Sequence, residues 1–240
     1  MRRILALSLL SLTSVSLPAQ AVDLDLLNLF VTQGDFRLLS EDLGAALSYK
    51  PLSPGEPLGI TGFDIGVEVT ATKLENSENY ANAFTGSPPD TLYLPKLHIH
   101  KGLPFGFDIG ASYSAVPDSN IKVWGVEVRY AILKGSTTLP ALAVRGSYSA
   151  LDGVDALKLN TTGVDLSISK GFAIFTPYAG IGRVWVTSTP DPATTLSEEE
   201  FDLGKVFLGV NMNLAVVNIA IEADKTGEAT SYGAKLGWRF

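Results

Sequence analysis

The chain has two histidines, His98 and His100, and they are the side chains best suited to proton transfer near neutral pH. If residues 91–101 form a strand, Lys96 and both histidines lie on one face, because alternate side chains share a side. A tight turn after this strand, pairing positions that sum to 206, would place His98 opposite Asp108. A histidine beside a carboxylate is half of a hydrolase site.

A hydrolase would also need a nucleophile, for which Ser112 and Ser114 follow on the next strand. No sequence motif accompanies these residues, and an ion network inside a polar cavity explains them better, with Glu127 paired across the following turn to Arg145. We therefore assign no catalytic residue and keep a hydrolase using His98 and Asp108 as the alternative. The network is expected to contain His98, Asp108, Glu127, Arg129, Arg145, Asp165, Lys205, Glu222, Asp224, Lys235 and Arg239.

No metal or cofactor site is assigned from the sequence. His98 and His100 supply two ligands, and two ligands do not make a site without a third. The acidic run at 197–200 has the composition of a solvated loop tip. Residues 180–182, Gly-Ile-Gly, lack the further glycine and the strand-to-helix context of a dinucleotide-binding turn.

Composition narrows the class of protein. The 240 residues include no cysteine, which excludes a disulfide framework and a thiolate metal site. Acidic residues outnumber basic ones by 25 to 18, so the chain lacks the basic surplus that nucleic-acid binding requires. Hydrophobic residues make up 46% of the chain, yet charged residues make up only 18%, against about 25% in an average soluble domain.

A two-residue alternation of apolar and polar side chains recurs along most of the chain, which predicts strands with one apolar face. The polar face is rich in Gly, Ser and Thr, which suits a crowded lumen, and the apolar face then needs hydrocarbon to cover it. The phase in 174–188 is not fixed, because Pro177 interrupts the pattern. Ten strands are predicted, at 60–73, 91–101, 104–116, 121–133, 139–152, 158–170, 174–188, 202–214, 217–226 and 230–240.

The N-terminus has the features of a secretory signal peptide. Arg2 and Arg3 precede an apolar run, and a small-x-small site predicts cleavage after Ala21. No later apolar run reaches the roughly 18 residues of a helical span, so a membrane role must be built from strands.

Between the leader and the first strand, the spacing predicts a short helix over 35–47. Phe36, Leu39, Leu43 and Leu47 form one apolar stripe, with Asp35 as the N-cap. The expected division is therefore a signal peptide at 1–21, a helical segment and proline-rich linker at 22–59 that could plug the lumen, and an all-β barrel at 60–240. The alternative has twelve strands, with 24–33 and 43–50 forming another hairpin.

The last strand carries a family resemblance. Tyr232, Leu236, Trp238 and Phe240 alternate up to an aromatic C-terminal residue, which resembles the closing strand of Gram-negative outer-membrane β-barrels with a small porin or OmpA-like layout. The resemblance implies a closed antiparallel transmembrane barrel located in the cell outer membrane, in contact with outer-membrane lipid. It also implies that the barrel assembly machinery reads these four residues as its signal.

Three functions remain open at this level. The first is a non-enzymatic barrel, either a narrow or plugged channel for small solutes or a structural envelope protein. The second is the outer-membrane hydrolase. The third is a soluble periplasmic barrel that binds a lipophile, which would require the apolar faces to point inward.

Overall fold

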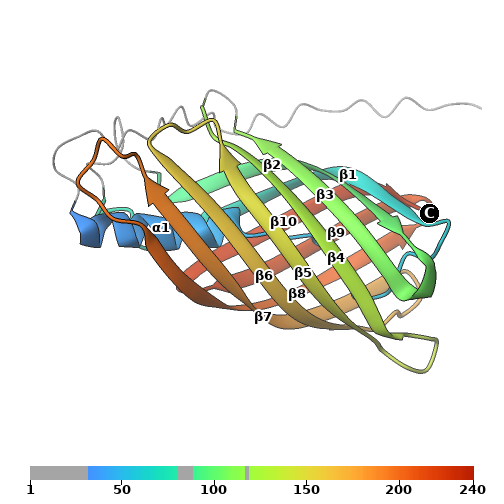
Figure 1. The fold of residues 1–240 in the computed structure, drawn as a ribbon. Helices are drawn as coiled ribbons and strands as arrows, with labels where there is room; N and C mark the ends of the chain where they lie inside the picture. The colour runs from blue at the N-terminus through green and yellow to red at the C-terminus, as the bar shows by residue number, and fades with distance from the viewer. Residues whose placement is uncertain (1–31, 81–88, 117–118) are drawn as a thin grey trace, which may run out of the picture.

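The computed structural model describes residues 32–80, 89–116 and 119–240, so the signal peptide and its cleavage site lie outside the described residues. The fold is one sheet rolled into a closed barrel, with helix α1 (Gln33–Leu47) inserted into one end (Figure 1). The strands are β1 (Phe63–Lys73), β2 (Thr91–Gly102), β3 (Phe107–Ala115), β4 (Lys122–Lys134), β5 (Ala141–Asp152), β6 (Leu157–Ser169), β7 (Phe175–Pro190), β8 (Glu199–Leu214), β9 (Val217–Thr226) and β10 (Ala229–Arg239).

Every strand pairs antiparallel with its sequence neighbours, and β1 closes on β10. At the seam, the backbone amides of Phe63 and Phe240 each donate to the carbonyl oxygen of the other, at 2.8 and 3.0 Å. Closure leaves no unpaired sheet edge. The ten-stranded antiparallel barrel is confirmed, and the twelve-stranded alternative is wrong because 43–47 belongs to the helix, while residues 24–31 of that alternative lie outside the described residues.

We call the barrel end at which β10 finishes the short-turn end, and the opposite end the loop end. The connection from β2 to β3 at the short-turn end contains a 3-10 turn, Pro104–Gly106, with Phe105 at a positive φ of 64°. Four residues therefore lie between the strands, and Gly102 pairs with Asp108 while His98 pairs with Ser112. The predicted opposition of His98 and Asp108 is wrong, because a tighter turn was assumed.

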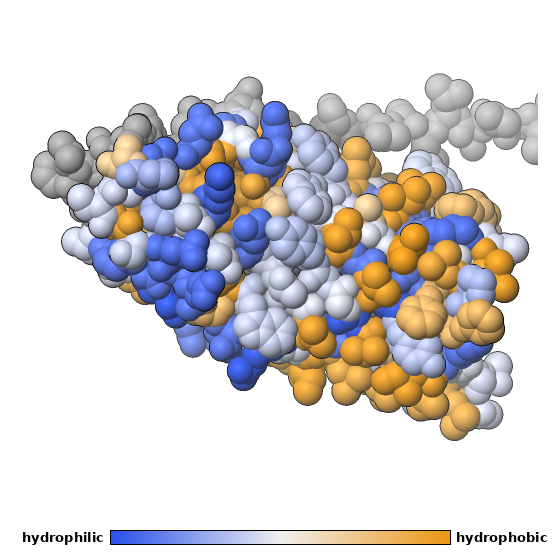
Figure 2. Space-filling model, viewed as in Figure 1, coloured by the Kyte–Doolittle hydropathy of each residue, from blue (hydrophilic) through white to orange (hydrophobic). Residues whose placement is uncertain are grey.

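The outer wall of the short-turn half is apolar. Figure 2 shows hydrophobic residues gathered over this half and hydrophilic residues over the loop-end half. Phe175 and Trp185 face outward ten residues apart on β7, which at about 3.3 Å per residue and a tilt of about 40° spans about 25 Å. An apolar band of about that height with aromatic rims is the surface that a barrel presents to lipid.

Aromatic residues lie at both edges of this band. Phe107 and Tyr130 stack at 4.7 Å between ring centroids toward the short-turn end, and Trp124 and Tyr148 at 5.4 Å toward the loop end. The four predicted assembly-signal residues, Tyr232, Leu236, Trp238 and Phe240, are all exposed on the outer side of the closing strand. An outward apolar surface of this extent is the reverse of what a soluble lipophile-binding barrel requires.

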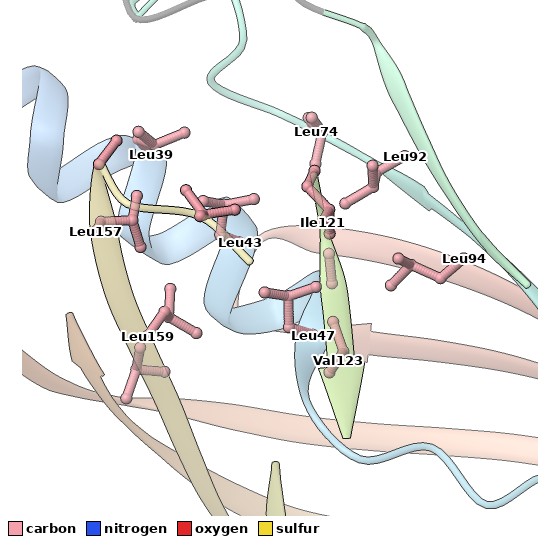
Figure 3. Close-up of a cluster of buried hydrophobic side chains, with 14 of the residues drawn as sticks. Leu39, Leu43, Leu47, Leu74, Leu92, Leu94, Ile121, Val123, Leu157 and Leu159 are labelled. Carbon is pink, nitrogen blue, oxygen red and sulfur yellow. The ribbon is translucent and has the colours of Figure 1, made fainter. Parts of the chain in front are cut away.

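Inside the loop end, the polarity of the wall is reversed. The α1 stripe of Phe36, Leu39, Leu43 and Leu47 is buried as predicted, and it packs against the inward side chains of the surrounding strands (Figure 3). The alternation predicts a polar lumen along each whole strand, but the lumen is polar only in the short-turn half. The helix provides the reason, because its apolar face needs an apolar surface to cover. The wall residues of this core include Leu74, Leu92, Leu94, Ile121, Val123, Leu157, Leu159, Val184 and Val186.

Helix α1 begins earlier than predicted. Thr32 is its N-cap, and its side chain accepts from the amide of Asp35 while the Asp35 carboxylate accepts from the Thr32 amide. Asp35 is thus the third residue of a capping box rather than the cap itself. Within the described ranges, no helix is both long and apolar enough to cross a bilayer.

Candidate functional site

After α1, residues 48–58 continue through the lumen to the short-turn end, where β1 begins. We call residues 33–58 the lumen segment. Polar side chains of the wall hold its backbone: Ser149 Oγ donates to the carbonyl oxygen of Leu47 at 2.7 Å, and Lys205 Nζ donates to that of Tyr49 at 2.9 Å. The linker part of the segment is therefore attached to the wall by hydrogen bonds that water could replace, whereas α1 is held by its apolar core.

Charged side chains fill the short-turn half of the lumen. Among the described residues, seven acidic and seven basic groups are buried or half-buried there, so their formal charges cancel. Charges removed from water need such partners to offset the cost of desolvation. The acidic groups are Asp64, Glu68, Asp108, Glu127, Asp165, Glu222 and Asp224, and the basic ones are Lys50, Lys96, Arg129, Arg145, Lys205, Lys235 and Arg239.

His98 lies between two carboxylates of β1. Its Nε2 is 3.0 Å from Asp64 Oδ1, and its Nδ1 is 2.9 Å from Glu68 Oε1. Each carboxylate also has an ammonium partner, since Lys235 Nζ is 3.0 Å from Asp64 Oδ2 and Lys96 Nζ is 2.5 Å from Glu68 Oε2. Both ring nitrogens therefore face carboxylates, an arrangement typical of an ion network and not of a hydrolytic couple.

The first strand pair explains this placement. His98 pairs with Gly66, whose inward neighbours along β1 are Asp64 and Glu68. A Cβ at position 66 would lie 2.5 Å from the carbonyl oxygen of Leu236 and 3.0 Å from Cε1 of His98, so glycine permits the close approach of β10 and leaves room for the imidazole. Gly110 plays the same part for His100, because a Cβ there would lie 2.1 Å from the ring.

His100 and the lumen segment meet at a second group of charges. The hydroxyl of Tyr49 lies 3.2 Å from His100 Nε2, and Glu127 Oε1 lies 3.4 Å from the same nitrogen. Arg145 joins Glu127 to the next strand, with Nη1 3.5 Å from Glu127 Oε2 and Nε 3.3 Å from Asp165 Oδ2. The ion pair expected between Glu127 and Arg145 is thus present.

Asp108 belongs to a third group, away from His98. Its Oδ2 is 2.7 Å from Arg129 Nη2, and its Oδ1 accepts from the amide of Leu58. Arg129 Nη1 also donates to Ser53 Oγ and to the carbonyl oxygen of Pro54. This pair anchors the linker instead of forming a hydrolytic couple, so the arrangement offers no support for a hydrolase that uses His98 and Asp108.

On the opposite wall, Lys50 Nζ lies 3.6 Å from Asp224 Oδ1, and the Tyr178 hydroxyl donates to Glu222 at 2.9 Å. Tyr178 is absent from the predicted network because Pro177 obscures the phase of β7. Asp64 and Glu68 are absent from it too, although both lie on the polar face of their strand. Lys50 could not be found, since its role depends on the path of the linker.

At the short-turn end, next to the linker, lies a cavity of about 450 Å³. Polar groups line much of it, among them Ser136, Thr137, Ser169, Thr176 and Asn213. Farther inside, where the lumen segment meets β2–β5, the free space is only about 30 Å³. The lumen is thus open and polar at one end and filled where the segment crosses it.

No family model and no curated protein matches this chain. Among solved structures, the N-terminal β-barrel domain of Pseudomonas aeruginosa OprF aligns at 11% identity over 76% of this chain and 99% of that one, with a TM-score of 0.37. The KdgM porin in complex with disordered oligogalacturonate aligns at 9% identity over 74% and 99%, with a TM-score of 0.39. OprG from Pseudomonas aeruginosa aligns at 13% identity over 78% and 99%, with a TM-score of 0.35. Resemblances this distant do not transfer a role to this chain.

Proposed function

We propose that this protein is an outer-membrane barrel whose lumen is a narrow path for small solutes, closed in the described state by its own N-terminal lumen segment. The apolar band and its aromatic rims support a place in a lipid bilayer. The signal-peptide pattern and the aromatic C-terminal strand support export to the outer membrane and recognition by the barrel assembly machinery.

The observation that carries the proposal is how the segment is held. Its linker lies in the polar half of the lumen, against Arg129, Lys205 and Ser149. Exchange with water costs about 0.5–1.5 kcal/mol for the bond from Ser149 and about 1.5–3 kcal/mol for each bond from Arg129 or Lys205. The linker can therefore leave without opening the wall, which the strand ladders keep closed, whereas displacement of α1 also requires its apolar stripe to separate from the wall.

The polar cavity at the short-turn end gives small solutes a site of entry. The balanced charges farther inside leave the short-turn half of the closed lumen without a net formal charge. Lys50 supplies one of the seven positive charges, so displacement of the segment would leave the wall with seven acidic and six basic groups. We therefore expect the opened path to favour cations weakly over anions.

A disulfide can test closure by the segment. Ser40 Oγ of α1 lies 2.8 Å from Ser188 Oγ of β7, and both residues are fully buried. Because the chain has no cysteine, Ser40→Cys with Ser188→Cys would form a single defined cross-link. In planar bilayers, we expect the reduced protein to open in steps and the oxidised protein to stay closed, with conductance restored by a reductant.

The matched control joins two wall strands and leaves the segment free. Thr72 Oγ1 on β1 lies 2.9 Å from Ser231 Oγ on β10. The protein carrying Thr72→Cys and Ser231→Cys should conduct equally when oxidised and when reduced. Equal opening of the helix-locked protein in both states would overturn the plug, and no conductance from any form would favour the structural role.

A further inference from the structure

Asp64, His98 and His100 form a group that the channel proposal does not use. All three are buried on the inner face of β1 and β2, and one ligand atom from each lies within 4.8 Å of the others. We propose that these residues bind one divalent transition-metal ion, with zinc as the probe. The inference rests on the geometry of the wall and does not depend on conduction.

The first two ligand atoms already have nearly the required separation. His98 Nε2 and Asp64 Oδ1 are 3.0 Å apart. Two ligands of one tetrahedral zinc lie about 3.3 Å apart, given bonds of about 2.0 Å. If a zinc ion replaced the proton between His98 Nε2 and Asp64 Oδ1, these two atoms would need to move apart by only a few tenths of an ångström. Lys235 engages the other oxygen of Asp64, so Oδ1 remains directed at His98.

The outer nitrogen of His98 is oriented as in metal sites. A histidine ligand usually donates its second ring N–H to a carboxylate, which fixes the tautomer and the ring plane. Glu68 Oε1 lies 2.9 Å from His98 Nδ1 but forms no hydrogen bond with it in the described state, so the ring must rotate slightly before Glu68 accepts that proton. This contact leaves Nε2 as the nitrogen that faces Asp64.

His100 supplies an unused nitrogen. The residue is 2% exposed, and Nδ1 has no hydrogen-bond partner among the described residues. A buried polar atom without a partner costs about 1–3 kcal/mol, which a bound ion would recover. The other nitrogen, Nε2, lies near Glu127 and the Tyr49 hydroxyl, so His100 also has a carboxylate behind it.

Two imidazoles and one carboxylate match the ligands that zinc takes in sites with an open coordination position. Three protein ligands leave the fourth position for water or another small donor. Gly66 and Gly110 leave the space in which both rings sit. The ammonium of Lys235, 3.0 Å from Asp64 Oδ2, opposes a second positive charge and should weaken binding.

The test uses the full mature chain, refolded in detergent, without a histidine tag and stripped with a chelator. Calorimetric titration with zinc should give one ion per chain, and cobalt should give the visible absorption of a tetrahedral site. Asp64→Asn and His100→Gln should each weaken binding at least tenfold. Glu68→Gln, which removes the carboxylate behind His98, should weaken it about 10–100-fold. Lys235→Met should instead tighten it.

Glu222→Gln is the matched control, since it removes a buried lumen carboxylate on β9 outside the three-residue group. Its affinity for zinc should equal that of the natural chain. Heat-modifiable gel migration verifies that each variant is folded. If the wild-type chain binds no zinc, or if folded His98→Gln/His100→Gln binds it unchanged, the site does not exist, whatever the conductance shows. Binding lost only on neutralising Glu198 and Glu200 would assign the ion to the loop instead and equally overturn the proposal.

Discussion

Gly44 of α1 lies so close to Val186 of β7 that a Cβ at position 44 would stand 2.7 Å from Val186 Cγ2. The helix therefore touches the wall through its own backbone. This contact fixes how deeply α1 sits in the loop end, and with it the start of the linker below.

Gly44→Ala should destabilise the seated helix. In an exposed helix the same change would stabilise by about 1 kcal/mol, but overpacking against Val186 should cost about 1–3 kcal/mol. We expect a lower free energy of unfolding in urea and more frequent opening in bilayers. Val186→Ala in the same chain should relieve the clash. Gly34→Ala, at a position with open space, should not lower the free energy of unfolding. If Gly34→Ala destabilised the protein and Gly44→Ala did not, the contact between Gly44 and Val186 would be contradicted.

Arg129 and Asp108 should behave as a coupled pair. Arg129→Met leaves the Asp108 carboxylate buried without its ion partner, which should cost about 3–5 kcal/mol in unfolding free energy. Adding Asp108→Asn to Arg129→Met removes the unpaired carboxylate charge and should recover part of the lost unfolding free energy. Additive effects of the two changes would show that the pair is not coupled. Denaturation in micelles measures Arg129→Met, Asp108→Asn and the double variant.

The Asp42 carboxylate secures the loop after β1 to the helix. Its Oδ2 accepts from the Tyr80 hydroxyl at 2.7 Å and from the Asn76 amide at 2.9 Å. Burial, together with this carboxylate, raises the pKa of Tyr80 well above its ordinary value. Tyr80→Phe should therefore destabilise by about 1.5–3 kcal/mol near neutral pH, the contribution of a hydrogen bond to a charged group.

The sign of the pH dependence follows from the raised pKa. The contribution of Tyr80 is fully present below about pH 10, where tyrosine in the unfolded chain ionises, and declines above it. The difference in stability between the natural chain and Tyr80→Phe should thus shrink in alkaline buffer. Tyr113→Phe, on the outer wall of β3, is the control and should show no such trend.

Leu208 tests the lipid-facing band. It is 64% exposed on the outer wall of β8, beyond which the same strand carries the exposed Glu200 toward the loop end. Leu208→Arg should lower the unfolding free energy in lipid vesicles by about 2–4 kcal/mol. Glu200→Arg should change it by less than about 0.5 kcal/mol. Similar costs at both positions would place the band elsewhere.

Phe240 should matter for assembly as well as for the seam. Its ring centroid lies 5.6 Å from that of Phe63 on the first strand. Deleting Phe240 should reduce the folded fraction in outer membranes, measured by heat-modifiable migration, more than it reduces refolding of the purified chain in detergent. A matched loss in both measurements would assign Phe240 a structural role alone.

The strands of the barrel could be predicted from the sequence because the alternation within each strand depends only on that strand's own two faces. Alternation in 105–116 and 217–226 follows from a wall with different solvents on its two sides, and each strand reports that difference by itself. The stripe of Phe36, Leu39, Leu43 and Leu47 identified the helix for the same reason. Its capping box was missed because Thr32 bonds three residues ahead, before the stripe begins.

The charged site was only partly predictable. The two-residue alternation predicts that Glu127 and Arg145 point inward. Their partners depend on the register between strands, which in turn depends on the length of the turns. Four connecting residues instead of a tight turn moved Asp108 away from His98 and toward Arg129. The path of the linker then brought in Tyr49 and Lys50, which no strand pattern contains.

The sequence by itself determined a chain that alternates into strands, carries one amphipathic helix and has too few charges for an ordinary water-covered surface. Tertiary structure alone decided that the helix lies inside the loop end, where it turns the inner wall apolar. It alone brought Asp64 of β1 beside His98 and His100 of β2. The alternation within a strand depends on the surroundings of its two faces. The charged site depends on which residues, far apart in the sequence, the closed barrel brings together.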